Sequence, residues 1–578
     1  MYLYSLNFLL QYDYNEPEYA RFVVTSSISS TSSAVATFKI DWNSGSQVKT
    51  GTFTKSITST FNATLYSRYE GPAIDDVVTS ATLLFSVMDG NTSIATSYHF
   101  QGDVTLDTNQ VIYGRAQEKN IIVSGKGKDL LVGGADEDTL IGHQGDDVLH
   151  GYGGNDTLYG GPGSDVMIGG KGDDTYYISR LDDLAIERPG EGIDSIYKER
   201  GDRRDMESWP QDAAYFTLPE NIENAYGYFE ILTGNKLDNI LDGTDYNVAT
   251  VYGEAGNDRL SAKTMYGGSG NDTYVLDSAT DVVSESLATG GSGTDLVEAS
   301  VSFSLSSSRA IGEIENLTLT GAAAIDGYGN ALANVIRGND AVNVLRGYDG
   351  NDTLIGGSGA SVIDTLDGGL GNDRFYLGEG NDTVRDAGGS DTIYTKISRD
   401  LGDYQAAGIE NVTIYDDAVA SARGTVGNNK LTGNDAKNTL YGEEGNDTLS
   451  GGGGNDKLLG GSGNDNLSGG LGQDIFYFNS KLSGSTNVDR ISDFSPDDDT
   501  LYLRSDVFTK ITGTGTLSSS QFVANSTGLA QDGNDRIIYE KDTGELYYDS
   551  NGSGSGGSVL FAILGMNLDL TRSDFFIY

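Results

Sequence analysis

The sequence predicts an all-β protein: a parallel β-roll solenoid, preceded by an antiparallel β-sandwich-like domain and followed by a C-terminal β cap. Three observations support this prediction. Aspartates recur every nine residues in several blocks, 80 of the 578 residues are glycine, and about the first 118 residues lack the repeat but alternate apolar with polar residues. A short fixed period indicates a solenoid of stacked units, whereas alternation with a period of two indicates half-buried strands.

Residues 1–118 are predicted to form the N-terminal β domain, whose role the sequence leaves open. Phe38, Ile40 and Trp42 alternate with polar neighbours, as in a strand with one buried face. The apolar stretch 1–10 has no basic flank, since Arg21 is the first basic residue, and no small-residue cleavage site follows it. We therefore expect a strand at 1–10 and not a secretory signal.

The nine-residue unit reads Gly-Gly-x-Gly-(Asn/Asp)-Asp-x-Leu-x, as at residues 153–158. Its glycines allow positive φ angles, so the chain can turn without a Cβ clash. The apolar residue at the eighth position, such as Leu158 or Leu449, is expected to point inward. Two units then make one coil, and strands of successive coils stack in parallel at about 4.8 Å.

The repeats fall into three modules of about a hundred residues, predicted at 119–245, 246–391 and 392–478. The triplet Ile-Glu-Asn recurs once in each module, at 222–224, 314–316 and 409–411. The aspartates in the repeat register are Asp129, Asp138, Asp147, Asp156, Asp165, Asp174, Asp258, Asp272, Asp352, Asp364, Asp373, Asp382, Asp391, Asp447, Asp456, Asp465 and Asp474.

The second module departs from the nine-residue spacing. Asp258 and Asp272 are fourteen residues apart, and Asp352 and Asp364 are twelve apart, which we interpret as turns bulged by extra residues. Asparagine takes the aspartate position where a block begins, as an uncharged opening rung of the stack. These asparagines are Asn334, Asn343, Asn429 and Asn438.

The charge of the chain requires a counter-ion. Its formal net charge is −47, and carboxylates on neighbouring coils would lie about 5 Å apart. Such a pair repels by about 1 kcal/mol in water and about 3 kcal/mol at an effective dielectric of 20. Calcium accepts 6–8 oxygen ligands in tolerant geometry, whereas magnesium demands a near-octahedral shell. Zinc prefers cysteine and histidine, and the chain has no cysteine and three histidines, so multiple Ca²⁺ ions are the expected cofactor.

The acidic composition also excludes other partners. Nucleic acid requires a basic surface, and no run of about 20 apolar residues exists to form a transmembrane segment.

The chain resembles the RTX (repeats-in-toxin) haemolysin-type calcium-binding family over about residues 119–478, on the repeat quoted above. Residues 479–578, with strands expected near 489–494 and 501–503 and a hairpin around 542–544, are similar to the C-terminal region of serralysin-type exoproteins. The resemblance implies that the seventeen register aspartates and the turn carbonyls hold calcium ions. It also implies that the final residues 574–578, an acid followed by four hydrophobics, act as a type I secretion signal.

The resemblance therefore implies export through a type I ABC exporter and an extracellular location, where calcium would fold the repeats. The chain has no His-Glu-x-x-His, no Gly-x-Ser-x-Gly elbow and no long amphipathic helices before the repeats, so the protease, lipase and pore-forming domains of that family are not expected. No catalytic residues are predicted.

Two other functions remain open. An extracellular hydrolase could use a small catalytic domain within 1–118, where Glu16 and Glu18 are the candidate carboxylate pair. A surface-layer or adhesive protein could be crosslinked by calcium and contact the cell surface or a polysaccharide. The leading hypothesis is a secreted, non-enzymatic calcium-binding protein.

Overall fold

The structure, a computed structural model, describes the backbone of seven strands between residues 3 and 101. From there it describes 109–198, 215–243, 250–285, 292–357, 362–378 and 380–578, without the side chains of 405–407. The chain divides into two compact units, the first reaching Asp272 and the second beginning at Thr273. In the described residues no helix is long and apolar enough to cross a membrane.

The N-terminal region contains two antiparallel sheets, as the predicted sandwich-like domain requires. One has the order β1-β2-β5, and the other pairs β4 with β3, β3 with β6 and β6 with β7. Their strands are β1 (Leu3–Tyr12), β2 (Ala20–Ile28), β3 (Ala34–Ser44), β4 (Gln47–Ile57), β5 (Phe61–Tyr66), β6 (Ser80–Asp89) and β7 (Thr92–Gln101). The strand expected at 1–10 is β1, whereas Glu16 and Glu18 lie outside the described residues.

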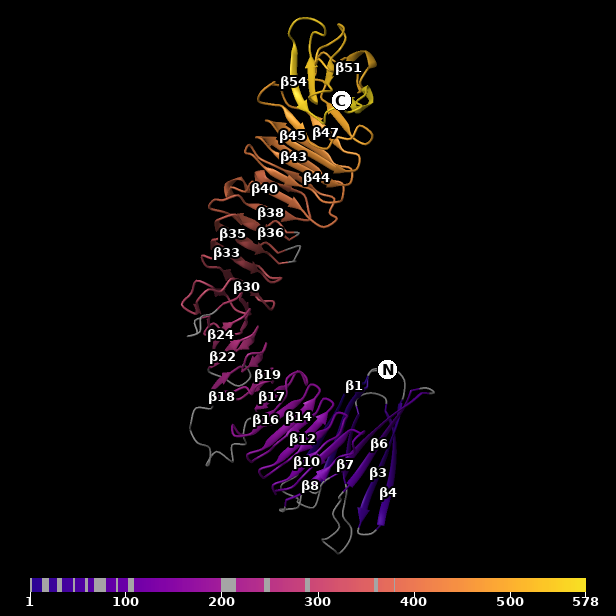
Figure 1. The fold of residues 1–578 in the computed structure, drawn as a ribbon, viewed down its shortest axis with the longest axis vertical. Coiled ribbons are helices and arrows are strands. Elements are labelled where there is room, and N and C mark those ends of the chain that lie inside the picture. Colours follow the sequence, from indigo (N-terminus) through magenta and orange to yellow (C-terminus); the bar gives the residue numbers. More distant parts are fainter. Residues whose placement is uncertain are drawn as a thin grey trace. The chain divides into compact units, whose positions relative to one another are not determined.

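The rest of the first unit is a parallel β-roll, in which short strands stack in columns (Figure 1). The first column contains β8 (Val111–Tyr113), β10 (Leu130–Val132), β12 (Val148–Gly153), β14 (Val166–Lys171) and β16 (Leu184–Ile186). The second contains β9 (Asn120–Val123), β11 (Thr139–Ile141), β13 (Thr157–Tyr159), β15 (Thr175–Ile178), β17 (Ser195–Lys198), β19 (Asn224–Gly227), β21 (Ile240–Asp242) and β23 (Arg259–Ser261). The third contains β18 (Tyr215–Thr217), β20 (Ile231–Thr233), β22 (Thr250–Ala255) and β24 (Thr264–Ser269).

The register confirms that two nine-residue units form one coil. Thr139 pairs with Thr157, and Thr157 with Thr175, in parallel. The middle residue of each short strand is buried, and Leu158 and Leu449 are 0% and 1% exposed, as predicted. Burying one such side chain contributes about 1.5–3 kcal/mol. The roll is therefore held by a column of single apolar side chains with the glycine turns outside it.

The second unit continues the same architecture. One column contains β25 (Thr273–Leu276), β27 (Leu296–Ala299), β30 (Asn316–Leu319), β32 (Val335–Arg337), β34 (Thr353–Ile355), β36 (Arg374–Tyr376), β38 (Thr392–Thr395), β40 (Asn411–Ile414), β42 (Lys430–Thr432), β44 (Thr448–Gly453), β46 (Asn466–Leu471) and β48 (Asp489–Ile491). One facing column contains β26 (Val282–Ser284) and β29 (Ala310–Ile311). A second contains β28 (Phe303–Ser304), β31 (Gly327–Tyr328), β33 (Val344–Asp349), β35 (Thr365–Leu370) and β37 (Thr383–Arg385). A third contains β39 (Arg399–Asp400), β41 (Ser421–Arg423), β43 (Thr439–Glu444), β45 (Lys457–Ser462), β47 (Ile475–Phe478) and β49 (Thr500–Leu503).

The two irregular spacings of the second module have different structural origins. The N–H of Asp352 donates to Asp373, 21 residues later, so this coil does carry an insertion. The N–H of Asp258, however, donates to Asp272, only 14 residues later, and the strands around them pair with the same offset. The expectation of a bulged turn at Asp258–Asp272 is therefore wrong, because the whole coil is shortened.

The C-terminal cap covers the last strands, β48 and β49, of two columns of the second unit. Strand β54 pairs in parallel with β48, and β55 pairs in parallel with β49, which removes the exposed edges that invite aggregation. The predicted hairpin is present as β52 and β53. The cap contains β50 (Gly515–Thr516), β51 (Phe522–Asn525), β52 (Ile537–Glu540), β53 (Glu545–Asp549), β54 (Ser558–Ile563) and β55 (Phe575–Ile577). Short 3₁₀ turns occur at η2 (Leu401–Ala407), η3 (Ser519–Gln521) and η4 (Arg572–Asp574).

Candidate metal sites

The register aspartates form ladders along the roll, one coil apart, with their side chains buried. The backbone N–H of Asp138 donates to Oδ1 of Asp156 at 2.7 Å, and the N–H of Asp156 donates to Oδ1 of Asp174 at 2.7 Å. The same bond recurs in the second unit, where the N–H of Asp456 donates to Oδ1 of Asp474 at 2.8 Å. One carboxylate oxygen of each aspartate therefore holds neighbouring coils together.

The other oxygen, Oδ2, is buried and has no hydrogen-bond partner in most of these residues. The aspartates with such an Oδ2 are Asp129, Asp147, Asp156, Asp165, Asp174, Asp258, Asp352, Asp373, Asp391, Asp447, Asp456, Asp465 and Asp474. A buried polar atom without a partner costs about 1–3 kcal/mol, and more when it is charged. Every one of these residues was predicted as a metal ligand, and each offers an oxygen that the protein itself does not use.

Most of the unpartnered oxygens lie beside a turn glycine. A methyl group added at Gly151 would lie 2.1 Å from Oδ2 of Asp156 and 2.8 Å from the carbonyl oxygen of Gly169, on the next coil. At Gly451 the corresponding distances, to Oδ2 of Asp456 and the carbonyl oxygen of Gly469, are 2.3 and 2.5 Å. A carboxylate oxygen and a carbonyl oxygen thus converge from adjacent coils, the donor set that a hard divalent cation prefers.

Three predicted ligands have no unpartnered carboxylate oxygen. Oδ2 of Asp138, Asp364 and Asp382 accepts a backbone N–H bond, from Gly134 at 2.5 Å, Gly357 at 3.0 Å and Gly378 at 3.2 Å respectively. Both of their oxygens are therefore already hydrogen-bonded. The remaining predicted ligand, Asp272, accepts the N–H of Asp258 on Oδ1 at 2.8 Å.

The asparagines expected as uncharged opening rungs have that role. Nδ2 of Asn343 donates to the carbonyl of Ile325 at 2.5 Å, and Nδ2 of Asn334 donates to the carbonyl of Glu315 at 2.8 Å. Asn429 and Asn438 bond the preceding coil in the same way. A carboxylate could not donate these bonds, which explains the exchange of Asp for Asn at the start of a block.

Several acidic members of the ladders were not predicted from the sequence. Asp183 accepts the N–H of Asp165 at 3.0 Å, and its position nine residues after Asp174 could have identified it. Asp194, Asp489 and Asp499 accept from residues 20, 24 and 25 positions earlier. Those spacings reflect coil lengths that the nine-residue period does not contain.

The glutamate of each Ile-Glu-Asn triplet continues a ladder between blocks. Oε2 of Glu223 accepts the N–H of Asp194 at 2.7 Å, and Oε2 of Glu410 accepts the N–H of Asp391 at 2.9 Å. Glu315 accepts from Asp295 in the same way, at 2.8 Å. The recurring triplet therefore supplies a carboxylate where a coil lacks the glycine code.

Burial changes the acidity of the ladder in the absence of a cation. Burial is the largest cause, with a smaller contribution from neighbouring acids, and together they raise the pKa of Asp156 to about 8 and those of Asp147 and Asp165 to about 7. The backbone hydrogen bond to each carboxylate opposes the shift. In the second unit the pKa of Asp447 is raised to about 7, and that of Asp456 to about 6, for the same reason.

These raised pKa values predict that protons partly replace the metal. A carboxyl whose pKa is higher in the folded than in the unfolded state, about 3.9 for Asp, takes up protons on folding. The resulting stability is fully present below about pH 4 and is lost as the pH rises through about 6–8. Chelator-treated protein should therefore gain β-structure in circular dichroism as the pH falls from 8 to 4. The calcium concentration that half-saturates the sites should rise as the pH falls, because protons compete with the ion.

Screening of surface charge is the control for this prediction. At pH 8 in 1 M NaCl, where the Debye length is about 3 Å, the chelator-treated chain should remain unfolded. An identical spectrum at pH 8 and pH 4 without calcium would contradict the raised pKa values.

Comparison with known proteins identifies the repeat. A family model for the RTX calcium-binding nonapeptide repeat (4 copies) matches residues 118–149, 141–176, 233–263, 264–283, 328–363, 363–384, 423–458 and 450–480. A search of curated proteins finds no match to this chain.

Two solved structures are similar to parts of the chain. One is the solution structure of the AlgE6R3 subunit from the Azotobacter vinelandii mannuronan C5-epimerase, with 26% identity over 26% of this chain and 79% of that chain, and a TM-score of 0.20. The other is the extracellular lipase LipA from Serratia marcescens, with 13% identity over 72% of this chain and 67% of that chain, and a TM-score of 0.16.

Proposed function

Since the chain carries RTX calcium-binding nonapeptide repeats folded as a β-roll, we propose that it is a secreted protein whose roll folds when it binds extracellular Ca²⁺. The single observation that supports this most is the column of buried aspartate oxygens without protein partners. At Asp147, Asp156, Asp258, Asp352, Asp447 and Asp456 this oxygen lies beside a glycine carbonyl of the next coil, so a cation bound there would join two coils.

We assign the side-chain ligands to the aspartates whose Oδ2 is unpartnered. The Oδ1 bond fixes each carboxylate in place, so little freedom is lost when the ion binds. A site at ten times its dissociation constant adds about 1.4 kcal/mol to the stability of the folded state. Several such sites acting together match the 5–15 kcal/mol by which a whole domain is usually stable.

Secretion before folding is supported by charge and by the C-terminal cap. With a net charge of −47, the repeats repel one another in the cytosol, where free calcium is low. Phe575 and Ile577, within the segment that resembles a type I signal, are 0% and 2% exposed in β55. A type I ABC exporter would therefore have to read this segment in the unfolded chain, and calcium outside the cell would then drive folding.

A calcium titration of the full chain tests this proposal. Starting from protein dialysed against chelator, folding followed by circular dichroism should have its midpoint at about 10⁻⁴–10⁻³ M calcium, the affinity range of extracellular modules. A midpoint below about 10⁻⁶ M would contradict it, because the roll would then fold inside the cell.

A further inference from the structure

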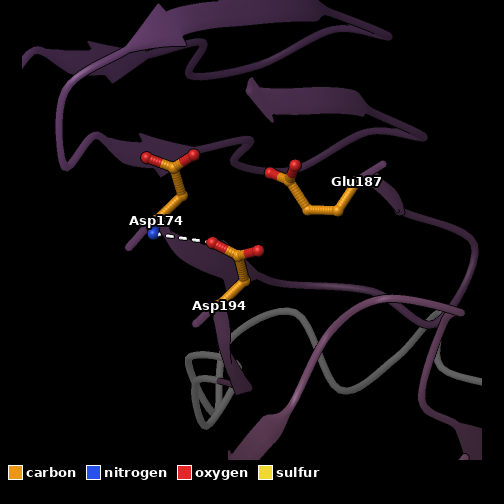
Figure 2. A group of neighbouring side chains, drawn as sticks. All are labelled: Asp174, Glu187 and Asp194. Carbon is orange, nitrogen blue, oxygen red and sulfur yellow. Dashed lines mark hydrogen bonds between the residues drawn. The ribbon is translucent and has the colours of Figure 1, made fainter. Parts of the chain in front are cut away.

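Three buried carboxylates meet where the first block of repeats ends (Figure 2). Asp174 precedes β15, Glu187 follows β16 and Asp194 precedes β17. One oxygen of each lies within 4.8 Å of the other two. The residues are 1%, 6% and 1% exposed, so water screens their mutual repulsion poorly.

Each carboxylate has one oxygen that the scaffold holds. Oδ1 of Asp194 accepts the N–H of Asp174 at 2.8 Å, the dashed line in Figure 2. Oε1 of Glu187 accepts the N–H of Gly170 at 3.1 Å and the hydroxyl of Tyr176. The second oxygens, Oδ2 of Asp174 and Oε2 of Glu187, are buried and have no partner.

The carboxylates converge on the space left by a glycine. A methyl group added at Gly169 would lie 2.2 Å from Oδ2 of Asp174 and 2.5 Å from Oε1 of Glu187. Glu187 stands eighteen residues after Gly169, at the position that a repeat would fill with its first glycine. The last coil of this block therefore presents a third carboxylate where the other coils present a glycine.

The second unit repeats the arrangement with different residues. One oxygen each from Asp373, Asp386 and Asp391 lie within 4.8 Å of one another. Oδ2 of Asp373, Oδ1 of Asp386 and Oδ2 of Asp391 are buried without partners. Asp386 follows Asp373 by the same thirteen residues that separate Glu187 from Asp174. Phe375 replaces the tyrosine here, so the cluster does not depend on the Tyr176 hydroxyl.

We propose that Asp174, Glu187 and Asp194 form a site for a hard cation. This site carries more negative charge than the sites of the repeats and fills first, at the lowest calcium concentration. Oxygens within 4.8 Å of one another can all contact one ion at 2.3–2.6 Å. Three carboxylates attract the ion more strongly than the carboxylate and carbonyl oxygens that converge at a repeat site, because ligand charge helps to set calcium affinity. This inference rests on the proposed calcium binding. An ion bound here would join the first block of repeats to its final coil.

Isothermal titration of the full chain with calcium alone tests the inference, with Glu187→Gln as the variant. Glu191→Gln is the matched control, because Glu191 lies in the same turn and its Oε2 accepts the N–H of Arg188 at 3.1 Å. We expect Glu187→Gln to weaken the tightest binding step at least tenfold, whereas Glu191→Gln should keep it within about twofold.

Terbium, which takes calcium ligands and emits when excited through a nearby tyrosine, locates the site. In the wild type the first equivalent should give tyrosine-sensitised emission. Tyr176→Phe should reduce this emission without reducing the number of ions found by calorimetry, because the hydroxyl bonds Glu187 and is not itself needed as a ligand.

The failures of this inference and of the proposed function can be separated. If Glu187→Gln and Glu191→Gln leave the tightest step equally changed, the three-carboxylate site is overturned, while calcium-dependent folding of both variants would leave the proposed function intact. If wild-type protein binds no calcium, both fail. Should Glu187→Gln not fold in saturating calcium, Asp194→Asn against the exposed Asp182→Asn makes the same comparison at the same site.

Discussion

Removal of calcium from the purified chain is expected to abolish the β-structure of the roll at pH 8. Without cations, each buried Oδ2 has no partner, which costs about 1–3 kcal/mol of folding stability. Such oxygens recur along both units. Their sum is at least comparable with the 5–15 kcal/mol that stabilises a typical domain. Far-ultraviolet circular dichroism in excess chelator should therefore show a coil spectrum, and added calcium should restore the β spectrum cooperatively.

Magnesium at equal concentration is the control for this prediction. It matches the charge of calcium but demands octahedral geometry at about 2.0–2.1 Å and releases its waters reluctantly. We expect it to leave the chain largely unfolded. Full recovery in magnesium would mean that general charge neutralisation, and not coordination between coils, folds the roll.

The substitution Gly463→Ala is expected to cause a large loss of stability in the repeats. Gly463 has a φ of +140°, and a methyl group there would lie 1.6 Å from the carbonyl oxygen of Gly445 on the preceding coil. That oxygen belongs to the backbone and cannot move without separating the stacked coils. Backbone strain and overpacking together should cost roughly 2–4 kcal/mol.

Gly533→Ala provides the comparison for this substitution. Gly533 lies in the cap, and a methyl group there meets nothing within 4 Å. Thermal unfolding in saturating calcium should show a clearly lower melting temperature for Gly463→Ala and one close to the wild type for Gly533→Ala. Equal melting temperatures for the two variants would show that the turns tolerate a side chain and that the described stacking is wrong.

The nine-residue period of the sequence could predict the buried core residues and the aspartate ladder, because both follow from a coil of fixed length. Leu158 and Leu449 point inward, and Asp156 lies one coil from Asp174, wherever eighteen residues make a coil. The fourteen-residue coil at Asp258–Asp272 could not be inferred in this way. A spacing of fourteen is compatible with a longer half-coil or a shorter whole one, and only the strand register separates them.

The roles of individual oxygens could not be predicted either. Asp382 and Asp456 occupy equivalent positions in the sequence, but Oδ2 of Asp382 accepts the N–H of Gly378 and Oδ2 of Asp456 has no partner. The difference depends on whether a backbone N–H of the turn points toward Oδ2, as that of Gly378 does. Glu187 was missed for a related reason, since it replaces a glycine and not an aspartate in the repeat.

The most direct test of metal coordination between the coils is an anomalous-scattering map from crystals of the full chain grown with calcium or terbium. If calcium joins the coils, peaks are expected about 2.3–2.6 Å from the carboxylate and carbonyl oxygens that converge beside the turn glycines, for example between Asp156 and Gly169 and between Asp456 and Gly469. Peaks found only on exposed acids such as Asp146, with these converging oxygens unbound in an ordered roll, would contradict it.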